Sequence, residues 1–228
     1  MNDYLNVSYD ENLKPYTKYP EQLVKYIFKK YDLKEKQNIL EIGCGRGEFI
    51  NEFYKLGMDV HAIDIYLQAK QKFPHIKIKY CDLETNILPY ENNFFDCIYS
   101  KSLVEHLYNP EKIFKNVLEI LKQGGKLITL TPCWKDNYKM FYEDYTHRTP
   151  FTLESLRDIH LANGFENVNV VKFIQLPILW SESFFLKKIF RILSLTSKFL
   201  LPVFLKKYSK WVRFSKETML LSYATKKK

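Results

Sequence analysis

The chain has 228 residues, 46% of them hydrophobic and 27% charged, a length and composition that suit one well-packed domain and exclude a disordered protein. Its four scattered cysteines include no CxxC pair, which indicates neither a disulfide framework nor a zinc site, so no metal is expected. The N-terminal stretch MNDYLNVSYDENLKPY contains acids and lacks the apolar core of a signal peptide, which predicts a cytoplasmic protein.

The net charge of +9 is concentrated toward the C-terminus. Residues 184–228 hold twelve Lys or Arg against one acid, Glu217, and therefore carry +11, whereas the first 183 residues sum to −2. A nearly neutral body joined to a strongly basic segment calls for a local explanation of that segment.

Apolar periodicity alternates between strand and helix along most of the chain. The predicted helices are 20–33, 47–57, 66–73, 110–125 and 151–165. The predicted strands are 38–42, 59–65, 76–80, 96–100, 126–132, 166–176 and 217–226. This alternation predicts an α/β fold with a doubly wound, mostly parallel sheet, and such sheets bind ligands at the carboxyl ends of their strands.

The stretch ILEIGCGRG, residues 39–47, lies where that rule places a ligand site. Gly43, Gly45 and Gly47 depart from the G-x-G-x-x-G spacing of dinucleotide-binding turns, and no Gly-Lys-Ser/Thr follows as in a P-loop. The carboxylate of Glu41 would also repel a buried pyrophosphate but would suit a ligand that presents a cation. The pattern therefore disfavours an NAD-dependent oxidoreductase.

This stretch resembles the first motif of class I S-adenosylmethionine-dependent methyltransferases, in which an acidic, glycine-rich turn holds the methionine part of the cofactor. The resemblance covers about residues 38–175. It implies a seven-stranded, Rossmann-like sheet, often with an antiparallel seventh strand. It also implies that Asp64 binds the ribose hydroxyls and that the segment Asp82–Leu83 flanks the adenine. The expected cofactor contacts are Glu41, Gly43, Gly45, Gly47, Asp64, Ile65, Asp82, Leu83, Ser100 and Tyr19.

The segment YEDYTHRTPF, residues 142–151, follows the fifth strand at the same rim of the sheet. It resembles the D-x-x-H-x-x-x-F segment of sugar and polysaccharide-pathway methyltransferases, and we expect His147 to act as general base with Asp144 as its partner. The alternative is a loop histidine that ties down a lid. His106, in SLVEHL, stays open between a structural role and a place in the pocket.

An oxygen acceptor is favoured because the N-P-P-[YF] motif of amide and adenine amino methyltransferases is replaced here by YSKSL. The sequence thus predicts O-methylation of a small molecule or glycan-pathway intermediate, with S-adenosylmethionine as cofactor. Alternatives are a non-catalytic cofactor-binding scaffold and a methyltransferase acting on a lipid or RNA. The chain is interpreted as one domain with an N-terminal helical cap (1–35), a cofactor-binding core (36–176), a basic helical insert (177–216) and a last strand with tail (217–228).

The basic insert has three interpretations. Lys187, Arg191 and Lys198 share one helical face, and the remainder of that helix is broadly apolar. The insert could pack its apolar side on the sheet or on a second subunit of a homodimer, with the lysines in water. It could instead contact an anionic membrane through residues 184–216, peripherally, since no uncharged run is long enough to span one. RNA binding is disfavoured because the apolar content exceeds what a nucleic-acid surface needs.

Overall fold

The computed structural model describes residues 15–180 and 183–228, and its centre is a seven-stranded sheet in the order β3-β2-β1-β4-β5-β7-β6. The strand β7 runs antiparallel to β5 and β6, and the other neighbouring strands pair in parallel. The strands are β1 (Asn38–Ile42), β2 (Asp59–Asp64), β3 (Lys77–Tyr80), β4 (Phe95–Lys101), β5 (Leu121–Pro132), β6 (Phe165–Ile174) and β7 (Thr218–Lys226). The predicted fold class is confirmed, including the antiparallel seventh strand.

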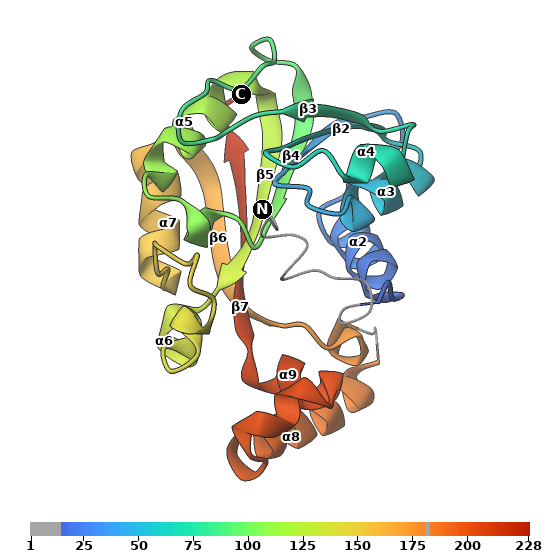
Figure 1. The fold of residues 1–228 in the computed structure, drawn as a ribbon, viewed down its shortest axis with the longest axis vertical. Coiled ribbons are helices and arrows are strands. Elements are labelled where there is room, and N and C mark those ends of the chain that lie inside the picture. Colours follow the sequence, from blue (N-terminus) through green and yellow to red (C-terminus); the bar gives the residue numbers. More distant parts are fainter. Residues whose placement is uncertain (1–14, 181–182) are drawn as a thin grey trace.

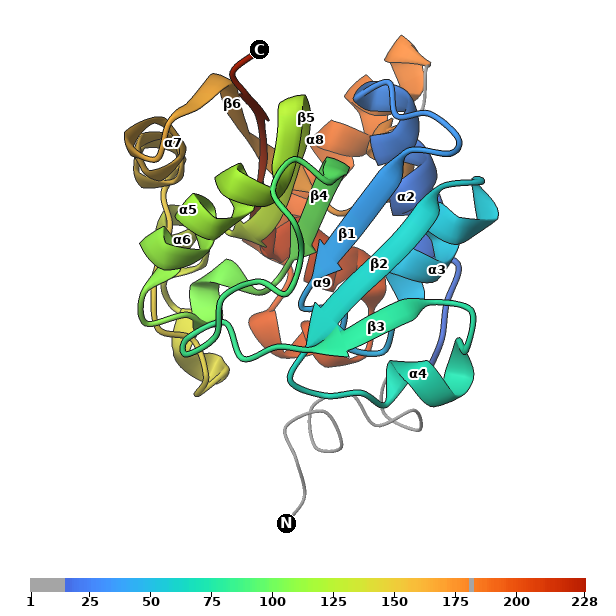
Figure 2. The same cartoon turned by 90° about the horizontal axis from the view of Figure 1, so that it is seen from above.

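Helices cover both faces of the sheet, with α2 and α3 on one face and α5 and α7 on the other (Figures 1 and 2). The α-helices are α2 (Tyr19–Lys30), α3 (Glu48–Lys55), α4 (Ala69–Lys72), α5 (Pro110–Ile120), α6 (Trp134–Asn137), α7 (Leu153–Ala162), α8 (Phe184–Leu200) and α9 (Lys210–Lys216). Short 3-10 turns are η1 (Val104–His106), η2 (Phe141–Glu143), η3 (Pro177–Trp180) and η4 (Val203–Lys207). Of the predicted N-terminal cap, residues 1–14 lie outside the described residues.

Two apolar cores lie on the opposite faces of the sheet, and β1 contributes to both. Leu40 and Ile42 pack with the α5 and α7 side, while Ile39 packs with the α2 and α3 side. Because side chains alternate across a strand, Glu41 points to the same face as Ile39. A carboxylate is thereby placed inside an apolar layer, next to the glycine-rich turn.

Two helix predictions need correction. The helix predicted over 110–125 ends at Ile120, and residues 121–125 belong to β5, because Leu121 pairs with Phe95 before the register shifts. The glycines Gly124 and Gly125 therefore lie within an irregular strand rather than at the end of a helix. The helix predicted over 66–73 is reduced to the single turn of α4.

In the helical insert between β6 and β7, the side of the long helix that carries Ser194 and Lys198 faces the protein. In α8, Ser194 is buried and donates to Ser215 Oγ at 3.0 Å, and Lys198 donates inward to Thr218 Oγ1. The apolar side of α8 faces outward, with Phe185 78% and Phe199 80% exposed. The interpretation that this apolar side packs on the sheet is therefore wrong. Figure 1 shows α8 and α9 beyond one end of the sheet.

Candidate active site

The glycine-rich turn joins β1 to α3 at the carboxyl edge of the sheet. Gly43 and Gly45 have φ angles of 72° and 51°, in the left-handed region that favours glycine. A Cβ atom at Gly43 would lie 2.8 Å from Leu103 Cδ1, so the Leu103 side chain would also have to shift to admit one. At Gly45 such an atom would meet nothing within 4 Å in the described structure, which means that the turn opens onto a cavity.

That cavity has a volume of about 300 Å³, enough for part of a nucleoside-sized ligand. It lies at the ends of β1, β2 and β4, where an open α/β sheet binds its ligands. Its lining includes Glu41, Gly45, Asp64, Ile65, Lys101 and His106.

Glu41 is almost fully buried, at 2% exposure, and its Oε2 atom has no hydrogen-bond partner among the described residues. Burial raises the pKa of Glu41 well above its usual value, while a backbone hydrogen bond from Ile50 acts in the opposite direction. An unpartnered carboxylate oxygen in a buried position is costly unless a ligand satisfies it. A cationic group, such as the ammonium of the methionine part of S-adenosylmethionine, fits this position.

Asp64 ends β2, and its carboxylate connects the glycine-rich turn with the loop that follows β2. Its Oδ2 accepts from the Gly45 backbone N–H at 2.8 Å, and its Oδ1 accepts from the Tyr66 backbone N–H at 2.8 Å. Burial raises the pKa of Asp64, and the backbone hydrogen bonds from Gly45, Tyr66 and Ile65 oppose that rise. The carboxylate retains acceptor positions for the hydroxyls of a ribose, the role expected from the sequence.

Other expected cofactor contacts lie outside the cavity lining of the described structure. Asp82 accepts from the Glu84 backbone N–H at 2.9 Å and so closes a turn, and Leu83 belongs to the apolar core. Ser100 is buried at the end of β4, facing a small apolar void. Gly47 precedes the first residue of α3 with a φ of 75°. The cofactor roles of these residues stay predictions.

Tyr19 lies one layer behind the cavity. Its hydroxyl donates to Gln175 Oε1 at 2.7 Å, and its ring packs against Phe49 and Phe214 at centroid distances of 6.2 and 5.1 Å. Phe49 itself lines the cavity. Tyr19 thus supports the cavity wall from α2, and direct contact with the cofactor stays a prediction.

Lys101, which the sequence analysis did not single out, brings a cation into the cavity. Its Nζ lies 5.3 Å from the centre of the Phe49 ring. Burial lowers the pKa of Lys101, and the nearby carboxylate of Glu105 partly compensates. The cavity therefore contains a buried carboxyl group and a partly buried amine, which together suit a zwitterionic ligand.

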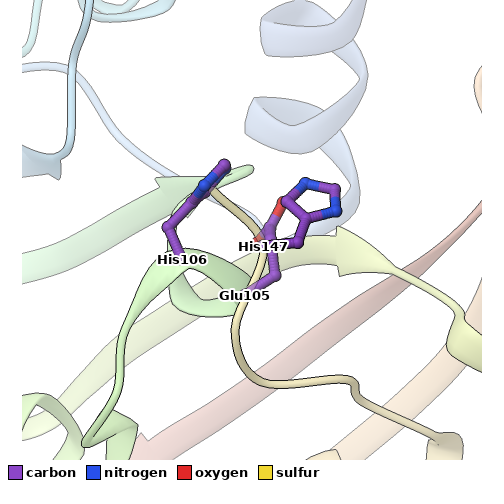
Figure 3. A group of neighbouring side chains, drawn as sticks. All are labelled: Glu105, His106 and His147. Atoms are coloured by element: carbon purple, nitrogen blue, oxygen red, sulfur yellow. The ribbon is translucent and has the colours of Figure 1, made fainter. Parts of the chain in front are cut away.

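A second group of polar side chains stands at the other edge of the cavity, where η1 meets the loop after η2 (Figure 3). The rings of His106 and His147 are 4.8 Å apart between centroids, and Glu105 lies beside them, fully buried. Burial, followed by the neighbouring His147, lowers the pKa of His106 to about 4. The neutral imidazole is thus the form of His106 near neutral pH.

The orientation of His147 differs from the expected one. Its Nδ1 atom lies 2.6 Å from the Phe141 carbonyl oxygen, so Nδ1 carries the proton and Nε2 the lone pair. Asp144 Oδ1 instead accepts from the backbone N–H and the hydroxyl of Thr146, at 3.0 and 2.5 Å. The Phe141 carbonyl thus has the orienting position assigned to Asp144, and the catalytic roles of Asp144 and His147 stay predictions.

Comparisons with known proteins identify the family and the fold. A family model described as methyltransferase domain matches residues 9–170. Phosphoethanolamine N-methyltransferase 2 of Caenorhabditis elegans is 31% identical over 176 residues, which cover 70% of this chain and 37% of that protein. Ubiquinone biosynthesis O-methyltransferase of Coxiella burnetii is 32% identical over 116 residues, which cover 47% of this chain and 48% of that protein.

Among solved structures, phosphoethanolamine N-methyltransferase 2 of Haemonchus contortus in complex with S-adenosyl-L-methionine superposes with a TM-score of 0.65. The identity is 19%, and the match covers 91% of this chain and 52% of that one, so the likeness concerns the fold. The chain spans about half or less of the length of these relatives.

The chain belongs to the methyltransferase-domain family. The class expected from its motifs, the class I S-adenosylmethionine-dependent methyltransferases, is confirmed together with the cofactor. This cofactor supplies a methyl group on a positively charged sulfonium sulfur, and Glu41, the glycine-rich turn and Asp64 are the residues that would hold it. The identity of the methyl acceptor is a separate question.

Proposed function

We propose that the protein methylates a hydroxyl oxygen of a small molecule or a sugar-pathway intermediate. The observation that supports this is the pair of histidines at the cavity edge, with His106 and Thr146 in the lining. In the transfer, the oxygen–carbon bond forms as the carbon–sulfur bond breaks, and the hydroxyl proton must leave. The lone pair on His147 Nε2 is placed to take that proton, since Nδ1 is held by the Phe141 carbonyl.

A panel of acceptors tests this proposal. Purified protein is incubated with S-adenosylmethionine and, separately, with catechols, sugar nucleotides and phosphoethanolamine, while S-adenosylhomocysteine formation and product mass are measured. We expect turnover with a hydroxyl acceptor and O-methylation of the product. Turnover with phosphoethanolamine alone would contradict the proposal, because that acceptor, named in the relatives, is methylated at nitrogen. Cofactor binding without turnover on any acceptor would favour the scaffold alternative.

We further propose that the outward apolar side of α8 docks on an anionic lipid surface. This side presents Phe185, Ile189, Ile192, Phe199 and Leu200, all more than half exposed. Lys188 and Arg191 are exposed beside it, and residues 184–228 carry a net +11. An apolar strip flanked by cations is complementary to an anionic bilayer interface.

Charge distinguishes this occupant from a second copy of the chain. A twofold dimer through α8 would bring the same basic surface of each copy against the other, and like charges oppose that contact. In the described part of the chain, no helix combines the length and apolar composition needed to cross a bilayer. The proposed contact is therefore peripheral, along the side of α8.

Vesicle sedimentation tests the docking. We expect the full chain to pellet with vesicles containing phosphatidylglycerol and to stay in the supernatant with neutral phosphatidylcholine vesicles. The double variant Phe185→Ser/Phe199→Ser should bind about 100-fold more weakly or worse, because each buried Phe contributes roughly 1.5–3 kcal/mol. The control Ile87→Ser removes an equally exposed apolar side chain, 76% exposed, from outside the insert. A dimer in ultracentrifugation that only the double variant abolishes would show that a second copy covers α8.

A further inference from the structure

Three side chains at the acceptor edge of the cavity form an arrangement that the sequence analysis did not foresee. Glu105, His106 and His147 each offer one ligand atom, and these atoms lie within 4.8 Å of one another (Figure 3). We propose that this cluster binds a divalent transition-metal ion, with Zn²⁺ as the probe. The absence of cysteine pairs led to the expectation of no metal, and this site uses no cysteine.

Hydrogen bonds at Nδ1 of His106 and His147 leave the Nε2 atom of each ring as a metal ligand. Thr146 Oγ1 donates its single proton to Asp144 Oδ1 at 2.5 Å and therefore accepts from His106 Nδ1 at 2.8 Å. The Phe141 carbonyl accepts from His147 Nδ1 at 2.6 Å. Both rings thus carry their proton on Nδ1 and their lone pair on Nε2. Metal-binding histidines in proteins are oriented in this way, by an acceptor at the nitrogen that does not bind the ion.

Glu105 supplies a buried carboxyl oxygen, with the amine of Lys101 nearby. Its side chain is 0% exposed, and Oε2 accepts from Thr131 Oγ1 at 2.9 Å. Its Oε1 has no hydrogen-bond partner within the described ranges of the chain. A buried, unpartnered carboxylate oxygen beside two imidazoles is accounted for if it binds a cation.

The ligand set and the geometry indicate the type of ion. Two imidazoles and one carboxylate, with a position left for a further ligand, form the set of several catalytic zinc sites. At metal–ligand distances of about 2.0–2.2 Å, tetrahedral ligands are roughly 3.3–3.6 Å apart. Ligand atoms within 4.8 Å need side-chain movements of about 1 Å to close on an ion. Magnesium is disfavoured because it prefers oxygen ligands.

The remaining coordination position faces the cavity, since His106 lines it. A hydroxyl oxygen of the acceptor at that position would lose its proton more easily, because a bound cation lowers the pKa of the hydroxyl. With the ion bound, the proton passes to solvent and His147 is a ligand; the role of base given above applies to the metal-free protein. This catalytic role rests on the proposed O-methylation, whereas the binding of the ion does not.

Titration of the chelator-treated full chain with ZnCl₂, followed by calorimetry and by metal analysis after gel filtration, tests the binding. We expect one ion per chain and an affinity reduced about 100-fold or more in Glu105→Gln and in His147→Gln. Glu105→Gln keeps the size of the side chain and an acceptor for Thr131. His75→Gln, which removes an exposed histidine from the segment between α4 and β3, is the matched control and should bind normally.

Equal zinc affinity in Glu105→Gln and the wild-type protein, or no stoichiometric binding at all, would overturn the site. Circular dichroism of the same samples separates loss of the site from loss of the fold. Stoichiometric zinc binding without turnover on any hydroxyl acceptor would support the zinc site and refute the proposed function. Full methyl transfer by metal-free protein would refute the catalytic role of the ion and return His147 to the role of base.

Discussion

Replacement of Asp64 by alanine is the sharpest test of the cofactor site. The carboxylate at the end of β2 accepts from the backbone N–H groups of Gly45 and Tyr66, each at 2.8 Å. It is also the group expected to bind the ribose hydroxyls. The substitution Asp64→Ala therefore removes ligand contacts and releases the glycine-rich turn from the neighbouring strand.

The expected loss of ligand affinity follows from the hydrogen bonds that Asp64→Ala removes. A hydrogen bond to a charged group contributes about 1.5–3 kcal/mol, so loss of one such bond to a ribose hydroxyl corresponds to roughly a 10- to 100-fold weaker affinity. Calorimetric titration with S-adenosylhomocysteine measures this directly. Asp59→Ala is the control, since Asp59 begins the same strand and forms an exposed ion pair with Lys77 at 2.9 Å, whose loss should leave ligand affinity unchanged.

A dissociation constant within about twofold of wild type in folded Asp64→Ala would refute the ribose assignment. Asp64→Asn covers the case in which the alanine variant does not fold. The asparagine retains one oxygen for a backbone N–H but presents an amide NH₂ to the other donor. We therefore expect intermediate affinity and a melting temperature between those of the wild type and the alanine variant.

Three further predictions concern other parts of the molecule. His147→Ala should lower turnover while S-adenosylhomocysteine affinity is kept, and unchanged turnover would give His147 a structural role only. Gly43→Ala should weaken cofactor binding because its Cβ would lie 2.8 Å from a Leu103 methyl, whereas Gly124→Ala, with a similar φ of 71° away from the cavity, should only reduce stability. Burial lowers the pKa of His160 to about 4. The contribution of His160 to the free energy of unfolding is therefore complete above about pH 6.5 and is lost as the pH falls toward 4. The total loss is on the order of 3 kcal/mol. Urea unfolding at pH 7 and pH 4.5 should show this loss, and His160→Leu should reduce it; an equal loss in the variant would assign it to other groups.

That Glu41, the glycine-rich turn and Asp64 meet at one cavity could be predicted from sequence, because these residues lie close along the chain or on adjacent strands. Glu41 and the three glycines lie within seven residues, and Asp64 ends the adjacent strand, so the order of elements along the chain already places them together. The role of Asp82 could not be predicted in this way. An aspartate after a strand either binds a ligand or closes a turn, and only the structure shows its carboxylate at the Glu84 backbone N–H.

The acceptor half could not be predicted in the same way. Glu105 and His147 are forty-two positions apart, and their meeting depends on how the loop after β5 folds back on η1. This contact is made by the backbone, since the N–H groups of Arg148 and Thr149 donate to the Glu105 carbonyl oxygen at 2.7 and 3.0 Å. The adjacent Glu–His pair in SLVEHL was the available signal. Nothing in the local pattern showed that Glu105 is buried beside a second histidine.

The orientation of α8 stayed open at the sequence level because periodicity identifies the two sides of a helix without showing which one faces the protein. In the structure, Ser194 and Ser197 hydrogen-bond to Ser215 and Trp211 of α9. The two helices thus pair through hydroxyls, and the apolar side is left outward.

The insert between β6 and β7 joins the sheet away from the strands that line the cavity. The 43 residues from 175 to 217 connect β6 and β7, which are antiparallel neighbours that a tight hairpin could join. Such a connection tolerates exchange of its whole length without a change in strand register. The cofactor-binding strands lie on the other side of β5, so they would keep their geometry when the insert is replaced. Gln175 and Phe214 of the insert contact Tyr19 behind the cavity wall, so a graft that keeps these two contacts would change the outer surface of the insert and leave the methyl-donor site in place.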